Sequence, residues 1–207
     1  MLITWQGLAC FRIGIRDISL LIDPYDATVG LKLSRQSADI VLSTSNRPAH
    51  KNVADIGGNP FVITGPGEYE AKGVYIWGHA VDQPTEPPRR TTVYVIEGEE
   101  ITLAHLGDLS IVLTEAQLDR LEGVDVLLIP VGGHGVLDAK KAAALISEIE
   151  PRVVIPMYYQ TPGVKPELDP VIKFSKELGV TPEMLDKFKV TKKDLPQDET
   201  KLVILKP

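Results

Sequence analysis

The chain has 207 residues, of which 22 are Lys or Arg and 28 are Asp or Glu, and its formal net charge is −6. This acidic balance argues against a general nucleic-acid or anionic-membrane binder, because both need a basic face. No apolar run approaches the roughly 20 residues that cross a bilayer, no secretory signal is evident, and Cys10 is the only cysteine, so we expect a cytoplasmic protein without an internal disulfide.

The first half of the chain reads as a series of short strands. Three β-rich runs, which end at Asp23-Pro24, predict an antiparallel meander: Leu2–Trp5, Ala9–Ile15 and Ile18–Ile22. Further strands are predicted at Asp39–Ser43, Phe61–Ile63, Val74–Trp77, Thr92–Ile96 and Ile101–His105. Gln83–Arg90 holds three prolines and is predicted to be an exposed loop, and residues 65–69 a tight turn.

The second half alternates between strands and helices. Thr114 and Gln117 predict a capping box for a short helix that ends at Leu121, and Asp138 predicts the N-cap of a second helix over Ala139–Ile149. Buried strands are predicted at Val124–Ile129, Val153–Pro156 and Leu202–Leu205, and further helices at Pro170–Leu178 and Thr181–Lys187. This order predicts sheets covered by helices, an α/β sandwich in layers, and we expect one domain over residues 1–207.

Six segments resemble, in order, the landmarks of metallo-β-lactamase-fold hydrolases. They are ITWQGLACF, LLIDPY, DIVLSTSNRPAH, ITLAHLGDLS, VDVLLIPVGG and RVVIPMYY. The branch that the chain resembles most holds ascorbate-phosphate lactonase-like proteins. The resemblance implies an α/β fold of the metallo-β-lactamase type, a four-layer αββα sandwich whose strand-end loops converge on one or two zinc ions.

The resemblance also shows where this chain departs from the family pattern. The family binds zinc through an H-x-H-x-D-H motif, whereas this chain reads Ser-Asn-Arg-Pro-Ala-His, so that Ser45 and Arg47 stand at histidine positions and only His50 matches. Tyr158 stands at a later histidine of the family, and Asp108 matches its bridging carboxylate. A catalytic zinc needs at least three protein ligands, so the motif is degenerate and no bound metal is expected.

A buried carboxylate without a counter-charge is costly, and this bears on Asp108 if no metal is bound. We expect the guanidinium of Arg47 to replace the cation and to pair with Asp108, and with Asp23 if that carboxylate lies within reach. The first functional reading is therefore a non-catalytic binding or scaffolding homo-oligomer. Its pocket, altered at the positions of the family's zinc ligands, would bind a small anionic ligand, which Arg47, Tyr158 and Ser45 would contact.

The alternative reading is a hydrolase that acts on a small anionic substrate through a reduced or displaced mononuclear metal site. Zinc would then be its cofactor, His50 and Asp108 its ligands, and His50, Asp108 and His105 its catalytic candidates. The interpretation favoured for His105 is a partly buried strand residue with no role in catalysis. A serine triad of Ser45, His50 and Asp108 is disfavoured, since Ser45 and His50 lie within a single turn.

Overall fold

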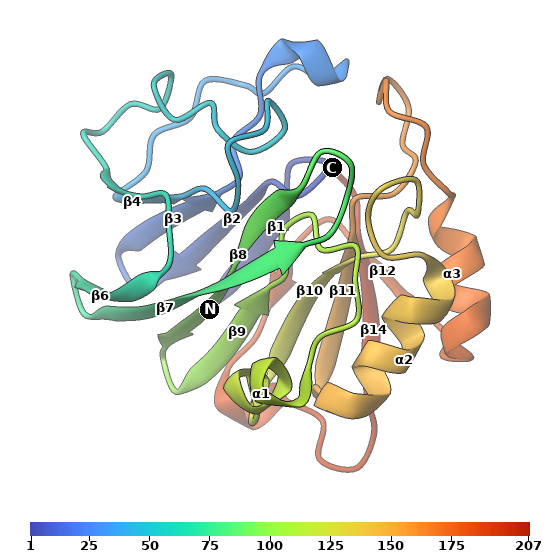
Figure 1. Ribbon diagram of the computed structural model, residues 1–207. Coiled ribbons are helices and arrows are strands. Elements are labelled where there is room, and N and C mark those ends of the chain that lie inside the picture. Colours follow the sequence, from blue (N-terminus) through green and yellow to red (C-terminus); the bar gives the residue numbers. More distant parts are fainter.

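The computed structural model describes residues 1–207 and contains two β-sheets packed face to face (Figure 1). The first sheet has six strands, which in spatial order are β13 (Phe188–Lys189), β1 (Leu2–Trp5), β2 (Phe11–Ile15), β3 (Ile18–Ile22), β4 (Ile40–Leu42) and β5 (Phe61–Ile63). The first three strands in sequence form the predicted antiparallel meander, and β3, β4 and β5 run parallel to one another.

The second sheet has eight strands. In spatial order they are β12 (Glu183–Leu185), β14 (Lys201–Leu205), β11 (Val153–Met157), β10 (Val126–Pro130), β9 (Ile101–His105), β8 (Arg89–Gly98), β7 (Val74–Gln83) and β6 (Gly67–Ala71). The strands from β12 to β9 are parallel, and β9, β8, β7 and β6 are antiparallel neighbours. All residues of β10 and β11 are buried, as expected for strands covered on both faces.

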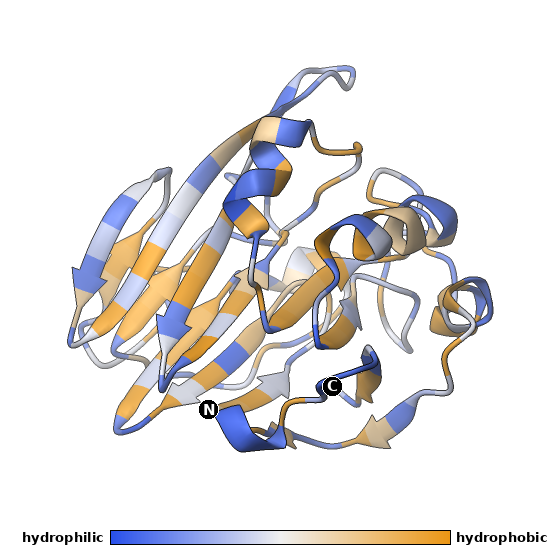
Figure 2. Ribbon diagram, turned by 90° about the horizontal axis from the view of Figure 1, so that it is seen from below, coloured by the Kyte–Doolittle hydropathy of each residue, from blue (hydrophilic) through white to orange (hydrophobic).

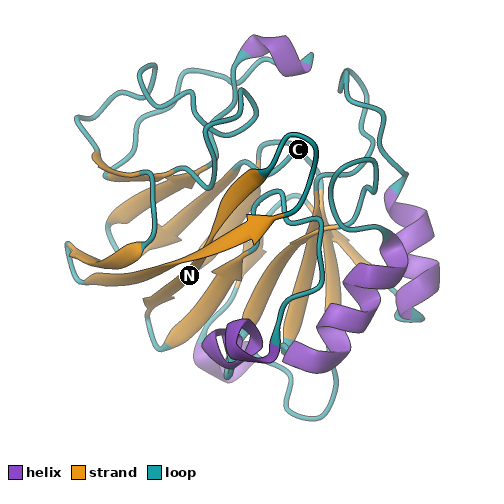
Figure 3. Cartoon of the chain, viewed as in Figure 1, coloured by secondary structure: helices purple, strands orange, loops and turns teal.

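Three α-helices accompany the second sheet, and α2 and α3 lie side by side over one of its faces (Figure 3). They are α1 (Glu115–Leu118), α2 (Ala139–Ile149) and α3 (Val171–Leu178), and 3-10 turns occur at Ala27–Val29, Asp119–Leu121 and Lys192–Asp194. Both predicted caps are confirmed, because the Gln117 side chain accepts from the Thr114 N–H and Asp138 accepts from the Lys141 N–H, each at 2.9 Å. No helix is long and apolar enough to cross a membrane.

The hydrophobic core is one cluster of buried residues that draws on both sheets and on the helices, and hydrophobic residues recur along the strands of both sheets (Figure 2). Alternate residues of the first sheet, such as Phe11 and Ile13, are fully buried, as the period of two predicts. From the second sheet, Tyr94 is fully buried and its hydroxyl donates to the Ser43 carbonyl at 3.1 Å, so this side chain points toward the first sheet. The α/β sandwich expected from the sequence is confirmed.

Three local predictions are wrong. Thr181–Lys187 is not a helix, because Glu183–Leu185 adds a parallel edge strand to β14. Gln83–Arg90 is not a loop throughout, since all three prolines fall within residues 84–88 and the flanking residues pair in the β7–β8 hairpin. The turn predicted at 65–69 continues into β6, which starts at Gly67. In each case pairing with a distant or neighbouring strand outweighs local composition.

Candidate functional site

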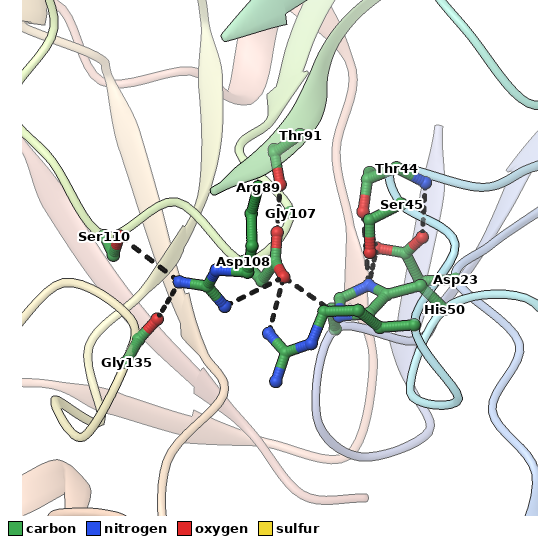
Figure 4. A network of polar contacts seen from close by, with 12 residues as sticks. Asp23, Thr44, Ser45, His50, Arg89, Thr91, Gly107, Asp108, Ser110 and Gly135 are labelled. Atoms are coloured by element: carbon green, nitrogen blue, oxygen red, sulfur yellow. Dashed lines mark hydrogen bonds and ion pairs between the residues drawn. The ribbon is translucent and has the colours of Figure 1, made fainter. Parts of the chain in front are cut away.

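The parallel strands of each sheet have their C-terminal ends on the same side of the molecule. The candidate site residues lie in the segments that follow these C-terminal ends. Asp23 follows β3, Thr44 and His50 lie in the segment after β4, Asp108 comes shortly after β9, and Tyr158 follows β11. Parallel strands place such residues in one row, which is where open α/β sheets commonly hold their functional groups. The cluster therefore draws on both sheets (Figure 4).

Asp23 fixes the orientation of His50. Asp23 Oδ2 lies 2.8 Å from His50 Nδ1, and both side chains are fully buried. The backbone N–H and the hydroxyl of Thr44 also donate to the two oxygens of Asp23, each at 2.7 Å. Burial lowers the pKa of His50, but the Asp23 and Asp108 carboxylates raise it by more, so that the net shift is upward. The imidazole is held in one position.

Asp108 is the second buried carboxylate, and it is 1% exposed. Its Oδ1 accepts a hydrogen bond from the Thr91 hydroxyl, and its Oδ2 lies 2.6 Å from Arg47 Nη1 and 3.6 Å from Arg89 Nη1. Burial raises the pKa of Asp108, but His50, Thr91 and Arg47 lower it by more, and the net shift is downward. Arg89 also donates to the Gly135 carbonyl at 2.9 Å, which anchors it beside the carboxylate (Figure 4).

The expected ion pair between Arg47 and Asp108 is thus confirmed. Its extension to Asp23 is wrong, because Asp23 is occupied by Thr44 and His50. The Arg47 side chain is 43% exposed, so the guanidinium reaches from solvent to a fully buried carboxylate. Such a geometry leaves several of its five N–H donors free for another partner.

His50 keeps one nitrogen unpaired. Its Nε2 has no hydrogen-bond partner although the ring is fully buried, and it lies 3.9 Å from Asp108 Oδ2. The ring stacks on Tyr158, with centroids 5.8 Å apart and planes 12° apart. Tyr158 has a backbone φ of 55°, which L-residues adopt rarely, and burial raises the pKa of its phenol to about 12. A neutral phenol ring therefore covers one face of the imidazole.

Residues 2–158 match the model of a beta-lactamase superfamily domain, which covers most of the chain. The chain belongs to the metallo-β-lactamase superfamily. It is 30% identical to a UPF0173 protein of Pyrococcus furiosus, over 86% of this chain and 90% of the relative. It is 26% identical to a UPF0173 metal-dependent hydrolase of Methanopyrus kandleri, over 89% of this chain and 96% of the relative.

A solved structure agrees with this membership. The chain resembles a Thermotoga maritima protein described as a Zn-dependent hydrolase of the metallo-β-lactamase superfamily, with a TM-score of 0.82 and 35% identity over 99% of this chain and 97% of that one. The chain is thus a metallo-β-lactamase-fold protein similar to metal-dependent hydrolases. The narrower resemblance to the ascorbate-phosphate lactonase-like branch stays a prediction.

The family implies zinc at this edge, so the donors of this metallo-β-lactamase-fold protein can be tested against that ion. His50 Nε2 and Asp108 Oδ2 are suitable donor atoms, but no three His, Cys, Asp or Glu side chains are placed so that together they could hold a metal ion. Arg47 lies within hydrogen-bond distance of the same Asp108 oxygen and would repel a dication there. The residues present therefore do not fit a catalytic zinc, which takes three protein ligands and a water.

Two other sequence candidates occupy different roles. His105 is fully buried with both nitrogens engaged, since Nε2 lies 2.9 Å from the Ala9 carbonyl and Nδ1 accepts from the Gly107 N–H at 3.1 Å. Both ring nitrogens of His105 are therefore engaged in buried hydrogen bonds, an arrangement that favours a structural role over a catalytic one. The Ser45 hydroxyl is buried without a partner and makes no hydrogen bond to His50, so the serine triad is not formed.

Three residues of the cluster were not among the predicted site residues: Thr44, Thr91 and Arg89. Thr44 lies inside the aligned strand-and-turn segment, and its position directly after a buried strand is a signal that could have found it. Arg89 and Thr91 carry no such signal. They reach Asp108 only because the β7–β8 hairpin pairs Gln83 with Arg89, and this register is not visible in a proline-rich segment.

Proposed function

We propose that this metallo-β-lactamase-fold protein is a non-catalytic binder of a small anion at the Arg47 face of the cluster. The observation that supports this is the Arg47 guanidinium, which lies 2.6 Å from the buried Asp108 while 43% of its side chain stays exposed. An arginine in this position offers a planar set of donors, which suits a phosphate or carboxylate ligand.

The charges around Arg47 favour the same proposal. Arg47 and Arg89 both pair with the buried Asp108. The buried Asp23 pairs with His50, which adds a further positive charge whenever it is protonated. An anion that enters beside Arg47 then meets a cluster whose negative charges are already compensated. Without that compensation the two carboxylates would repel it.

Titration calorimetry with inorganic phosphate tests the proposal. We expect saturable binding that weakens at least about tenfold in Arg47→Gln, because one charge-assisted contact is lost. Arg90→Gln is the matched control, since Arg90 pairs with the exposed Asp82 on the same hairpin and should bind as the wild type does. Wild-type protein that does not bind phosphate or carboxylate anions, or equal loss in both variants, would refute the proposal.

The alternative function is a hydrolase with a reduced mononuclear metal site. It is favoured by the unpaired, fully buried Nε2 of His50 and by relatives that carry the name metal-dependent hydrolase. Metal analysis after zinc-supplemented expression separates the two functions. A stoichiometric metal that is lost in His50→Gln would establish the alternative, whereas less than about 0.1 equivalent would support the binding protein.

The proposal includes self-association into a scaffolding homo-oligomer. Its support is the edge strand β5, on which Phe61 is 50% and Val62 43% exposed beside unpaired backbone groups. Sedimentation velocity on wild-type protein and on Val62→Lys provides the test. We expect the oligomer of the wild type to dissociate in the variant, and a monomeric wild type at high concentration would remove this part of the proposal.

A further inference from the structure

A cavity that shares no lining residue with the strand-end cluster lies between the β7–β8 hairpin and the segment that carries α1. It has a volume of about 390 Å³, within the usual range of small-ligand pockets. Because Tyr94 points toward the first sheet and side chains alternate along a strand, its neighbour Val93 points to the opposite, outer face. His79 pairs with Val93 and shares this face.

The floor of this cavity is apolar. Four of its lining side chains belong to the buried core: Val81, Val93, Leu113 and Leu121. Ala116 of α1 lines it from the exposed side. Contact with such a floor favours a ligand with an apolar body, since its burial removes hydrocarbon surface from water.

The polar groups of the cavity converge at one place. Arg120 Nη1 lies 3.2 Å from His79 Nδ1, and Arg120 takes part in no ion pair within 4.0 Å. A guanidinium can only donate, so Nδ1 of His79 accepts and the proton of the neutral ring is on Nε2. Burial and then Arg120 lower the pKa of His79, against a smaller opposite effect of Glu68, so the neutral ring is the favoured form at pH 7.

Arg120 thus carries a positive charge without a counter-ion beside an apolar floor, in a protein whose net charge is −6. The His79 Nε2–H adds a neutral donor. One cationic fork and one neutral donor match a single carboxylate, whereas a multiply charged phosphate would bring more charge than one guanidinium compensates.

We propose that this cavity binds a small organic monocarboxylate, with the carboxylate on Arg120 and His79 and the apolar body against Val81 and Val93. The site shares no lining residue with the Arg47 cluster, and the proposal does not depend on the function proposed for that cluster.

Titration calorimetry of the full chain with octanoate tests this proposal, with the corresponding alcohol, octanol, as the ligand that lacks the charge. Arg120→Gln removes the cation, and Ala116→Leu fills the cavity from its exposed side without replacing a core residue. Arg35→Gln is the matched control because Arg35 is exposed and lies in no ion pair. Arg47→Gln reports whether octanoate binds instead at the strand-end cluster.

We expect saturable octanoate binding that weakens at least about tenfold in Arg120→Gln and similarly in Ala116→Leu. Arg35→Gln should bind octanoate as the wild type does, and Arg47→Gln should keep the binding event that Arg120→Gln weakens. Octanol should bind much more weakly. The proposal is overturned if octanoate does not bind, if octanol binds equally well, or if Arg47→Gln rather than Arg120→Gln abolishes binding. Circular dichroism and the unfolding midpoint of each variant verify that the fold is retained.

Discussion

Arg47→Gln tests whether the guanidinium compensates the buried charge of Asp108. Breaking a fully buried pair by removing one partner costs about 3–5 kcal/mol. Here the pair is only half buried, since Asp108 is 1% but Arg47 43% exposed, and Arg89 stays 3.6 Å from the same oxygen. Solvent screening and Arg89 reduce the expected loss in the free energy of unfolding to about 1–2 kcal/mol.

Urea unfolding, followed by the fluorescence of the two tryptophans, measures this loss. The double variant with Asp108→Asn completes a mutant cycle, in which the two single losses should fail to add by about 1 kcal/mol because the residues are in contact. Arg90→Gln removes an arginine from an exposed ion pair and should unfold at the wild-type urea concentration. Two results would refute the idea that Arg47 compensates the charge of Asp108. The first is single-variant losses in unfolding free energy that add up in the double variant, and the second is an Arg47→Gln variant as stable as the wild type.

Three further predictions concern stability. Gly132→Ala should destabilise the fold by about 2 kcal/mol or more, because a Cβ there would overlap the Tyr158 carbonyl oxygen; thermal unfolding measures this, and an unchanged midpoint would contradict it. The pKa of His50 is raised above its ordinary value of 6.5, so its contribution to stability is complete below pH 6.5 and is lost as the pH rises through the folded-state value. The unfolding free energy of the wild type should therefore fall as the pH rises above 6.5, and His50→Asn should remove this slope. Phe174→Ala, at a fully buried position of α3, should cost about 3–5 kcal/mol in urea unfolding, and a loss below about 1 kcal/mol would show that α3 packs loosely.

The elements with strong local signals could be predicted from the sequence. The meander follows from alternating apolar residues, and α2 from its apolar face and its Asp138 cap, which accepts from Lys141. The edge strand Glu183–Leu185 could not be predicted in this way. It forms by pairing with β14, and this contact between two separate segments exists only in the folded chain. Short segments without periodicity take their structure from their neighbours in space.

The same distinction applies to the site. The Arg47–Asp108 pair was predictable, because a buried carboxylate at a strand end needs a compensating charge and one cation stood nearby in the aligned motif. The role of Asp23 as the partner of His50 was not, since it depends on the Nδ1 distance of 2.8 Å and on Thr44 holding the carboxylate. The contact of Arg89 with Asp108 could not be predicted either, because the segment around Arg89 was predicted to be a loop.

The proline-rich turn at residues 84–88 lies beyond the last paired residues of the β7–β8 hairpin. A peptide epitope or a spectroscopic label could be inserted there without altering the ladder. One extra residue between Arg89 and Thr91 would disrupt the sheet, because every following side chain of β8 would then point to the opposite face. Among relatives with this fold, insertions and deletions should therefore occur in that turn. They should be rare at the strand positions that follow it.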